Sequence, residues 1–584
     1  METYAVDFET FYDQKGGYSL KKQTVYDYVH HELFDAYLVA IVGTDGLIYS
    51  GPPEKAPWDE IQGHTWISHN MSFDYQVYQR LVDLGKIEPL YPEEWHCTAN
   101  MVAYFQSPRA LQTACYALLG EEISKEVREA MAGVSYYDLT PSEKKEWDKY
   151  AIDDSRYCLQ LWEKYSPEWP EVERALSLST IMQGIQGVNI DKERLDSGIK
   201  SLNDELFDLA QTLPWRKEYA LLSKKGVEKE CERLGIKPPS SMAKDDPRFD
   251  KWMERNKHLD LPWVENLGKI RSYNKALKFL ETVKSRIRDD GNMYFATKYF
   301  GAAATGRWSG ETGLNMQNLT KNPVFGVEMR KLFIPRRDKL FIISDLSQIE
   351  PRALNWMVGN EVFLNFVRSG ADCYEAHARA SMGYTDKRPL KDVDTKMRQY
   401  AKARVLGAGY GASGPRFVEI AKIMAGLEIS TKEACQVVAA FRKSNPLIVG
   451  MWNQLDRAFR RTRPGKTLEI ELASGRVVNY FNCDGESASI TKGSPQTRRF
   501  WGSKLTENIT QATARDVLGF HWVLLAEQGF DVLWNVHDEL IIEVDESTAE
   551  EDLKTITEIM STCPDWLEGC PIACEAHITT EYCK

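Results

Sequence analysis

FIISDLSQIEPRAL, residues 341–354, and DVLWNVHDELIIEV, residues 531–544, decide the fold of the C-terminal part of this chain. The first is an apolar strand that ends at Asp345 and is followed by a helix. The second consists of two apolar strands joined by a tight turn, which places His537, Asp538 and Glu539 at its tip. Acids near strand ends are common in turns, so either stretch alone is only a weak signal of catalysis.

Around these stretches the chain alternates between strand-rich and helical regions. The first 165 residues, with strand-like TYAVDFE and AYLVAIVG, indicate a compact α/β unit. A helical passage at 170–186 and a charged helical region at 190–290 follow, and strands return from residue 291. Residues 361–445 are mostly helical. Because 584 residues exceed what one hydrophobic core organises, we expect two to four domains.

The composition is that of a soluble globular protein, with 43% apolar residues. No uncharged apolar stretch reaches about 18 residues, and METYAVDFET at the N-terminus is unlike a secretory signal. Eleven scattered cysteines favour a reducing compartment over a disulfide framework. Cys563, Cys570, Cys574 and Cys583 lack a C-x2-C pair, so packed or exposed thiols are favoured over a metal site. We therefore expect a cytoplasmic protein that contacts no membrane.

Charge is unevenly distributed in this acidic chain, whose net charge is −12. Residues 268–288, GKIRSYNKALKFLETVKSRIR, carry seven cations against the single acid Glu281. A solvated helix face and a surface that follows nucleic-acid phosphates are both compatible with this run.

Four acids and a tyrosine form a pattern in the first 165 residues. Asp7 and Glu9 share one face of the strand TYAVDFET, because alternate residues of a strand point to the same side. Asp74 follows in SHNMSFDY, and Asp154 lies one helical turn after Tyr150. Each acid alone is compatible with an ordinary surface position.

Together these residues match D-x-E, N-x-x-x-D and Y-x-x-x-D, in that order. This pattern resembles the DEDD-type 3′-5′ exonucleases, which have a ribonuclease-H-like fold. The resemblance implies that Asp7, Glu9, Asp74 and Asp154 hold two divalent metal ions and that Tyr150 orients the attacking water. Hard oxygen ligands suit such ions, so we expect a competent nuclease.

Four segments of the C-terminal part resemble motifs of the family A DNA polymerases. DLSQIE and VHDE are similar to motifs A and C, and RQYAKARVLGAGYG, residues 398–411, is similar to motif B. TGRWSGETGLNMQN, residues 305–318, resembles the family segment T-G-R-x-S…N-x-Q-N with one or two extra residues. The resemblance covers essentially the whole chain and implies a right-hand polymerase behind the exonuclease.

The resemblance implies a role for each matching position. Asp345, Leu346 and Asp538 would bind two Mg²⁺ ions, which Mn²⁺ can replace, and Glu539 would support them. Glu350 would be the steric gate against a ribose 2′-hydroxyl. The other nucleotide-binding positions are Arg398, Lys402, Leu406, Tyr410, Gln348 and Tyr374, with Lys402 protonating the departing pyrophosphate. The DNA-binding positions are Arg307, Asn315, Gln317, Gln511, His537, Lys269, Lys275 and Lys278.

Motif B is predicted as one helix with Arg398, Lys402, Leu406 and Tyr410 on a single stripe. The glycines among them are expected to allow close approach of DNA or backbone and to ease bending. Leu406 replaces the family's Phe or Tyr, so we predict poor incorporation of dideoxynucleotides. Tyr374 stands where many relatives carry histidine, and His377 follows one turn later, so either residue is a candidate for contacting the triphosphate.

The predicted class is an α/β and α+β multidomain protein. Its parts are the exonuclease at 1–165, a connecting helix and thumb at 166–292, palm at 293–360, fingers at 361–447 and further palm at 448–584. We expect no 5′-nuclease domain before residue 7, as in a compact phage-type enzyme.

The expected partners are primer-template DNA, dNTPs and replisome proteins such as a helicase and a single-strand-binding protein. We expect a monomer that works in phage replication in the host cytoplasm. A single-subunit RNA polymerase and a catalytically reduced DNA-binding or exonuclease-only protein are the alternatives. Glu350 argues against the first, and the retention of Asp345 and Asp538 argues against the second.

Overall fold

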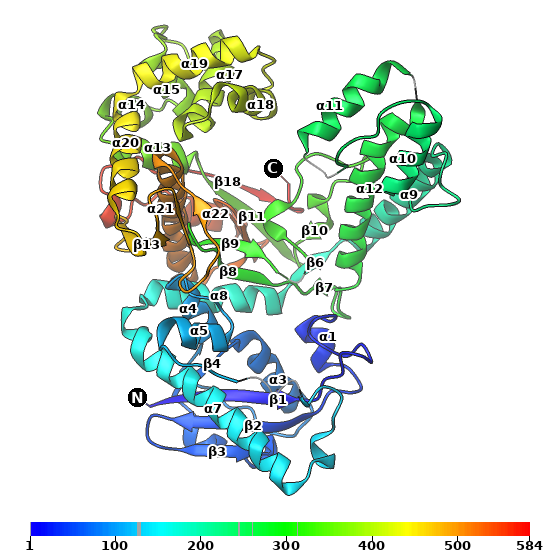
Figure 1. The fold of residues 1–584 in the computed structure, drawn as a ribbon. Helices are drawn as coiled ribbons and strands as arrows, with labels where there is room; N and C mark the ends of the chain where they lie inside the picture. Colours follow the sequence, from blue (N-terminus) through cyan, green and yellow to red (C-terminus); the bar gives the residue numbers. More distant parts are fainter. Residues whose placement is uncertain (1, 125–129, 243–245, 260, 312, 584) are drawn as a thin grey trace.

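The computed structural model describes residues 2–124, 130–242, 246–259, 261–311 and 313–583. It combines sheets with helical regions, which confirms the predicted α/β and α+β multidomain class. Figure 1 shows the N-terminal sheet at one end, a central sheet beyond it, and two helical groups on opposite sides of the central sheet. None of the helices in the described part of the chain has both the length and the apolar character that a membrane crossing requires.

The N-terminal region is built on a five-stranded sheet in the order β3-β2-β1-β4-β5. β1 lies in the middle, antiparallel to β2 and parallel to β4. Its alternation buries Tyr4, Val6 and Phe8 in one core cluster and leaves Asp7 and Glu9 partly exposed. The elements are β1 (Thr3–Thr10), α1 (Val25–Val29), β2 (Ala36–Gly43), β3 (Ile48–Gly51), α2 (Trp58–Ile61), β4 (Thr65–Ser68), α3 (Met71–Asp83), β5 (Glu94–Cys97), α4 (Thr98–Tyr104), α5 (Leu111–Leu118) and α7 (Pro141–Tyr165).

A long helix, α8 (Glu171–Gln186), links this region to the rest of the chain (Figure 1). Beyond it, a small sheet joins β6 (Val188–Ile190) to β7 (Asn292–Met293) and β10 (Phe333–Ile334). The helical arm between β6 and β7 comprises α9 (Lys192–Gln211), α10 (Lys224–Arg233), α11 (Pro247–Asn256) and α12 (Pro262–Lys284).

The central sheet has the order β16-β17-β11-β18, and all its pairings are antiparallel. Its strands are β11 (Lys339–Leu346), β16 (Asp531–Val536), β17 (Glu539–Asp545) and β18 (Cys574–Thr579). Phe341 and Ile343 of β11 belong to one core cluster, and Ile342 and Leu346 belong to another. Both faces of β11 are therefore buried, which explains its continuous apolar run.

Helices and hairpins surround the central sheet. The helices are α13 (Ile349–Met357), α21 (Gly502–Glu527) and α22 (Ala549–Met560), and the hairpins are β8 (Thr297–Ala302) with β9 (Arg307–Gly310), β12 (Lys466–Glu471) with β13 (Val477–Cys483), and β14 (Ser487–Ala488) with β15 (Arg498–Arg499). The helical cap comprises α14 (Glu361–Arg368), α15 (Cys373–Ser381), α16 (Leu390–Val393), α17 (Thr395–Leu406), α18 (Gly414–Ala425), α19 (Thr431–Ser444) and α20 (Pro446–Arg461). The mostly helical character predicted for 361–445 is confirmed.

Candidate active sites

Two acids from distant parts of the chain meet at one end of the central sheet. Asp345 ends the apolar run of β11 and lies opposite Glu539 in the β11–β17 ladder. The next residue, Leu346, donates its backbone N–H to the carbonyl of Asp538 at 3.0 Å. The structure therefore brings Asp345 and Asp538 to adjacent positions on neighbouring strand ends. Glu539 is buried beside them and accepts a hydrogen bond from the Tyr582 hydroxyl at 2.7 Å.

The tight turn that carries Asp538 is held by a buried glutamine. His537 has a left-handed backbone, with φ of +55°. Gln317 accepts a hydrogen bond from the His537 N–H at 3.0 Å and donates to the Asn535 carbonyl at 2.6 Å. Its side chain is buried, so its amide holds the protein's own turn. Both ends of the Gln317 amide are bonded to backbone, and its predicted contact with DNA stays a prediction.

Arg307 lies at the centre of a charged cluster beside this turn. Its guanidinium Nη2 lies 2.5 Å from Glu350 Oε1 and 3.3 Å from Asp538 Oδ1. Burial lowers the pKa of Arg307, but the two carboxylates more than offset that effect and the net pKa is raised. Tyr410 donates its hydroxyl to Glu350 Oε2 at 3.2 Å, and burial followed by the Glu350 charge raises its pKa. Four predicted site residues therefore share one cluster.

The pKa of His537 is lowered, first by burial and then by the charge of Arg307. Near it, the predicted DNA-binding residue Asn315 is exposed, and its side-chain oxygen accepts from the Gln317 N–H at 3.0 Å. Gln511 is half-buried on α21. The DNA-binding roles of Asn315, Gln511 and His537 stay predictions.

Most of the nucleotide-binding candidates lie on the adjacent cap helices α15 and α17 or at the start of α13. Arg398 on α17 forms an ion pair of 2.5 Å with Asp372, the N-cap residue of α15. The guanidinium also lies 5.4 Å from the ring centre of Tyr374. Gln348 adopts φ of +52° and accepts the Cys373 N–H at 2.7 Å, which ties the start of α13 to α15.

His377 and Tyr374 occupy different environments. The His377 ring is buried, stacks on Phe441 at 5.6 Å between ring centres, and has its pKa lowered to about 3 by burial and then by the Arg404 charge. Tyr374 is half-buried beside Arg398. Of the two candidates for a triphosphate contact, the structure therefore favours Tyr374.

The prediction of one continuous helix through motif B is wrong. α17 ends at Leu406, and a short 3₁₀ turn, Ala408–Tyr410, follows. Arg398, Lys402 and Leu406 share the helix, but Tyr410 lies beyond it. Gly411 has φ of +78°, and a Cβ there would lie 2.2 Å from the Ser503 hydroxyl on α21. This glycine therefore serves a left-handed turn in close contact with a side chain, outside the helix.

The seven cations of 268–288 do not form one surface. Lys269, Lys275 and Lys278 are exposed on α12. Lys284 forms an ion pair of 2.7 Å with Asp196. The remaining cations face the protein: Arg271 stacks on Phe249, Arg286 is buried, and Arg288 stacks on Tyr26 and Tyr294. Only the three exposed lysines fit the predicted phosphate-facing role.

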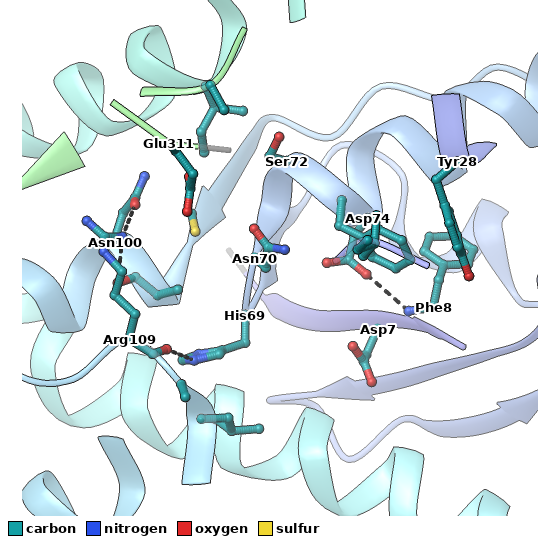
Figure 2. Close-up of a pocket in the computed structure, with 18 of the residues that line it drawn as sticks. Asp7, Phe8, Tyr28, His69, Asn70, Ser72, Asp74, Asn100, Arg109 and Glu311 are labelled. Carbon is teal, nitrogen blue, oxygen red and sulfur yellow. Dashed lines mark hydrogen bonds between the residues drawn. The ribbon is translucent and has the colours of Figure 1, made fainter. Parts of the chain in front are cut away.

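A second site lies in the N-terminal region, in a cavity of about 680 Å³. Its wall includes Asp7, Glu9, Asp74 and Asp154, so one cavity brings together the four predicted acids. Figure 2 shows Asp7 and Asp74 on neighbouring elements, with Asp74 bonded to the backbone of Phe8. The Phe8 N–H donates to Asp74 Oδ1 at 3.1 Å. Burial and then the charge of Asp7 raise the pKa of Asp74 well above its ordinary value.

Tyr150 is placed differently from the acids. Its ring is buried and stacks on Trp147 with 5.1 Å between ring centres, and it is not part of the cavity wall. The expected role in orienting water therefore requires Tyr150 to reach the cavity from this packed position. That role stays a prediction.

The far side of the cavity comes from another part of the chain. Lys298 and Glu311, which form an ion pair of 3.3 Å, line it together with His69 and Arg109. Figure 2 shows Glu311 across the cavity from Asn70 and Ser72. Arg109 donates to Asn100 Oδ1 at 2.6 Å and to the Tyr299 carbonyl. Lys298 of β8 carries no local sequence signal for this cavity, because its place in the wall depends on the packing of β8 against α4.

Neither site forms a closed cage of protein ligands. Among the described residues, no group of three or more His, Cys, Asp or Glu side chains could hold a metal ion on its own. The donor sets nevertheless suit Mg²⁺, which binds through one or two carboxylates together with substrate phosphates and water. The charge of Asp7 contributes, after burial, to the raised pKa of Asp74, and a divalent ion would relieve this repulsion between carboxylates.

Comparisons with known proteins agree on one family. A model of the family described as DNA polymerase family A matches residues 189–584. The chain is 24% identical to the DNA polymerase of Bacillus phage SP02 over the full length of both. It is 25% identical to DNA polymerase I of Aquifex aeolicus, covering 71% of this chain and 67% of that one.

A solved structure has the same fold across the whole chain. It is the POL domain of Pol1 from M. smegmatis in complex with DNA primer-template and dNTP. The match has a TM-score of 0.71 at 17% identity and covers 100% of this chain and 95% of the other.

Proposed function

Because this chain belongs to DNA polymerase family A and is a DNA polymerase, we propose that it adds dNTPs to a primer 3′-hydroxyl on a DNA template and proofreads with its N-terminal region. The observation that carries the polymerase site is the meeting of Asp345 with Asp538 at the end of the central sheet. In this proposal the helical arm is the thumb, the helical cap is the fingers and the central sheet is the palm.

The palm residues would hold the reacting groups. Asp345, Leu346 and Asp538 would bind Mg²⁺ or Mn²⁺, and Glu539 would support the strand end that carries them. Divalent ions, when bound, would activate the oxygen nucleophile and neutralise developing negative charge. Arg307, Gln511 and His537 would contact minor-groove acceptors that all correct base pairs share.

The fingers residues would hold the incoming nucleotide. Arg398 and Lys402 would bind the triphosphate, and Lys402 would give a proton to the leaving pyrophosphate. Glu350, fixed between Arg307 and Tyr410, would exclude a ribose 2′-hydroxyl. Leu406, at the last position of α17, would face the sugar.

The N-terminal cavity would be the proofreading site. Asp7, Glu9, Asp74 and Asp154 line it and would hold divalent ions there. Shortening a mispaired primer from its 3′ end would then complement extension in the palm. The full-length similarity to the polymerase of phage SP02 supports a role in phage DNA replication in the host cytoplasm. We expect the enzyme to act as a monomer with a helicase and a single-strand-binding protein.

One experiment separates the two sites. With a labelled primer-template, Mg²⁺ and dNTPs, Asp538→Ala should abolish extension while the primer is still shortened, and Asp7→Ala should do the reverse. Asp204→Ala, which changes an exposed acid of α9, is the matched control and should alter neither product. Extension by Asp538→Ala would overturn the polymerase mechanism, and primer shortening by Asp7→Ala would overturn the nuclease assignment.

A further inference from the structure

Arg307 is preceded by a turn whose two last carbonyls are held by buried guanidinium groups. Arg476 Nη2 donates to the carbonyl of Thr305 at 3.1 Å, and Arg515 Nε donates to the carbonyl of Gly306 at 3.0 Å. Gly306 has φ of +73°. Because the left-handed Gly306 is held by a charged hydrogen-bond donor, the turn is fixed. The turn therefore sets the direction in which the Arg307 side chain leaves the backbone.

The linking helix α8 supplies the counter-charge for Arg515. The Glu173 carboxylate of α8 accepts hydrogen bonds from both terminal nitrogens of the Arg515 guanidinium, one of them at 2.8 Å. It also accepts a hydrogen bond from the Tyr299 hydroxyl at 2.6 Å. Arg515 and Glu173 are both buried. Burial raises the pKa of Glu173, but the Arg515 charge more than offsets it and the net pKa is lowered.

A second bond ties the other neighbour of Arg307 to the same helix. The Trp308 indole N–H donates to the Thr180 hydroxyl of α8 at 2.8 Å. Residues on both sides of Arg307 are therefore fastened to α8, directly at Trp308 and through Arg515 at Gly306. Arg476, the other arginine that holds the turn before Arg307, forms an ion pair of 2.9 Å with Asp516.

A buried ion pair of this kind rarely adds net stability, because the cost of removing both charges from water offsets their attraction. Its geometric effect is different, since a bidentate carboxylate–guanidinium pair fixes orientation. We propose that Glu173 and Arg515 are positioning residues that aim Arg307 at Asp538 and Glu350, and so couple the linking helix to nucleotidyl transfer. The inference rests on the proposed assignment of Asp538 to the polymerase site.

The test is a double-mutant cycle of single-turnover primer extension at saturating dNTP, with Asp7→Ala in every protein to suppress hydrolysis. We expect Glu173→Gln to slow the maximal rate about tenfold and Arg307→Ala about a hundredfold. If Glu173 acts through Arg307, the double variant should be no slower than Arg307→Ala alone. If the two losses multiply, so that the double variant is about a thousandfold slower than the parent, the proposal is overturned. A Glu173→Gln enzyme as fast as its parent would overturn it as well.

Two further variants separate positioning from general loss of structure. Arg515→Lys keeps the charge but loses the donor to Gly306, and should slow extension to the same extent as Glu173→Gln. Glu543→Gln breaks another carboxylate–arginine pair, in which Glu543 is buried and Arg336 is partly exposed, and should leave the rate unchanged. If Glu173→Gln does not fold, the cycle is run with Arg515→Lys, and the same outcomes decide.

If Asp538→Ala still extends primers, the proposed polymerase site is wrong. If only Glu173→Gln extends primers at the parental rate, the positioning role is wrong and the proposed polymerase site stands.

Discussion

The Tyr410 hydroxyl lies 3.2 Å from Glu350, and the other oxygen of that carboxylate is held by Arg307. A carboxylate fixed from both sides cannot swing away from a bulkier sugar. We therefore expect Glu350→Ala to lower discrimination against ribonucleotides by at least about tenfold. Incorporation of each rNTP and dNTP on one template measures this ratio. Tyr410→Phe, which removes one of the two holding bonds, should give a smaller loss, and unchanged discrimination in Glu350→Ala would contradict the gate assignment.

The three exposed lysines of α12 should govern how DNA affinity depends on salt. Each phosphate contact removed lowers the slope of log affinity against log salt by about 0.9. We expect the triple alanine variant of Lys269, Lys275 and Lys278 to bind primer-template more weakly and with a shallower slope. Lys284→Ala, on the same helix but paired with Asp196, is the control and should keep the parental slope. Fluorescence anisotropy over a salt series measures both proteins.

Leu406 should limit the use of dideoxynucleotides. It is half-buried at the end of α17, and an aliphatic side chain offers no hydroxyl near the sugar. We predict that the parent protein incorporates chain-terminating dideoxynucleotides poorly. Leu406→Tyr should raise the ratio of ddNTP to dNTP incorporation at least about tenfold, and Leu406→Phe is the control that adds a ring without a hydroxyl. Efficient termination by the parent at equimolar ddNTP would show the prediction to be wrong.

Gln317 should be needed for the geometry of the turn at His537 and Asp538. Gln317→Leu fills a similar volume but leaves the Asn535 carbonyl and the His537 N–H without this partner. Each lost partner costs about 1–3 kcal/mol in the free energy of unfolding, and extension should slow as the turn loosens. Chemical denaturation and single-turnover extension measure the two effects. A Gln317→Leu protein with parental rate but weaker DNA binding would instead support a direct DNA contact.

His377 should make the stability of the helical cap depend on pH. Its folded pKa of about 3 lies below the unfolded value of about 6.5, so the unfolded chain binds the extra proton between these values. The free energy of unfolding should therefore fall by about 1.4 kcal/mol per unit as pH drops from about 6.5 towards 3. His377→Leu should remove this part of the dependence. Denaturant midpoints at pH 7, 5.5 and 4.5 test it, and parallel curves for both proteins would contradict it.

The strands at both sites could be predicted from sequence because their patterns are local. The apolar run 341–346 and the paired runs around His537 require no knowledge of distant neighbours. The ladder pairs Asp345 with Glu539, the residue next to Asp538. The acids at Asp7, Glu9, Asp74 and Asp154 follow an ordered pattern, and they line one cavity.

What could not be predicted depends on packing between distant segments. Nothing near Arg288 in the sequence indicates that it stacks on Tyr26, and nothing near Gln317 indicates that its amide is used by a turn two hundred residues later. The sequence pattern does not reveal the end of α17, because a spacing of four residues persists to Tyr410 although the backbone changes at Gly407. Lys298 and Glu311 carry no local signal for the cavity they line.

The order of strands in the central sheet has a consequence for biosynthesis. β11 is complete at residue 346, but both of its neighbours, β17 and β18, come from the last fifty residues of the chain. On a ribosome the N-terminal sheet has all its strands once Cys97 has emerged, whereas β11 stays without neighbours until residues 539–579 are available. An unpaired apolar strand is prone to non-native association. The nascent chain therefore carries this unpaired apolar strand while residues 347–538 are being made.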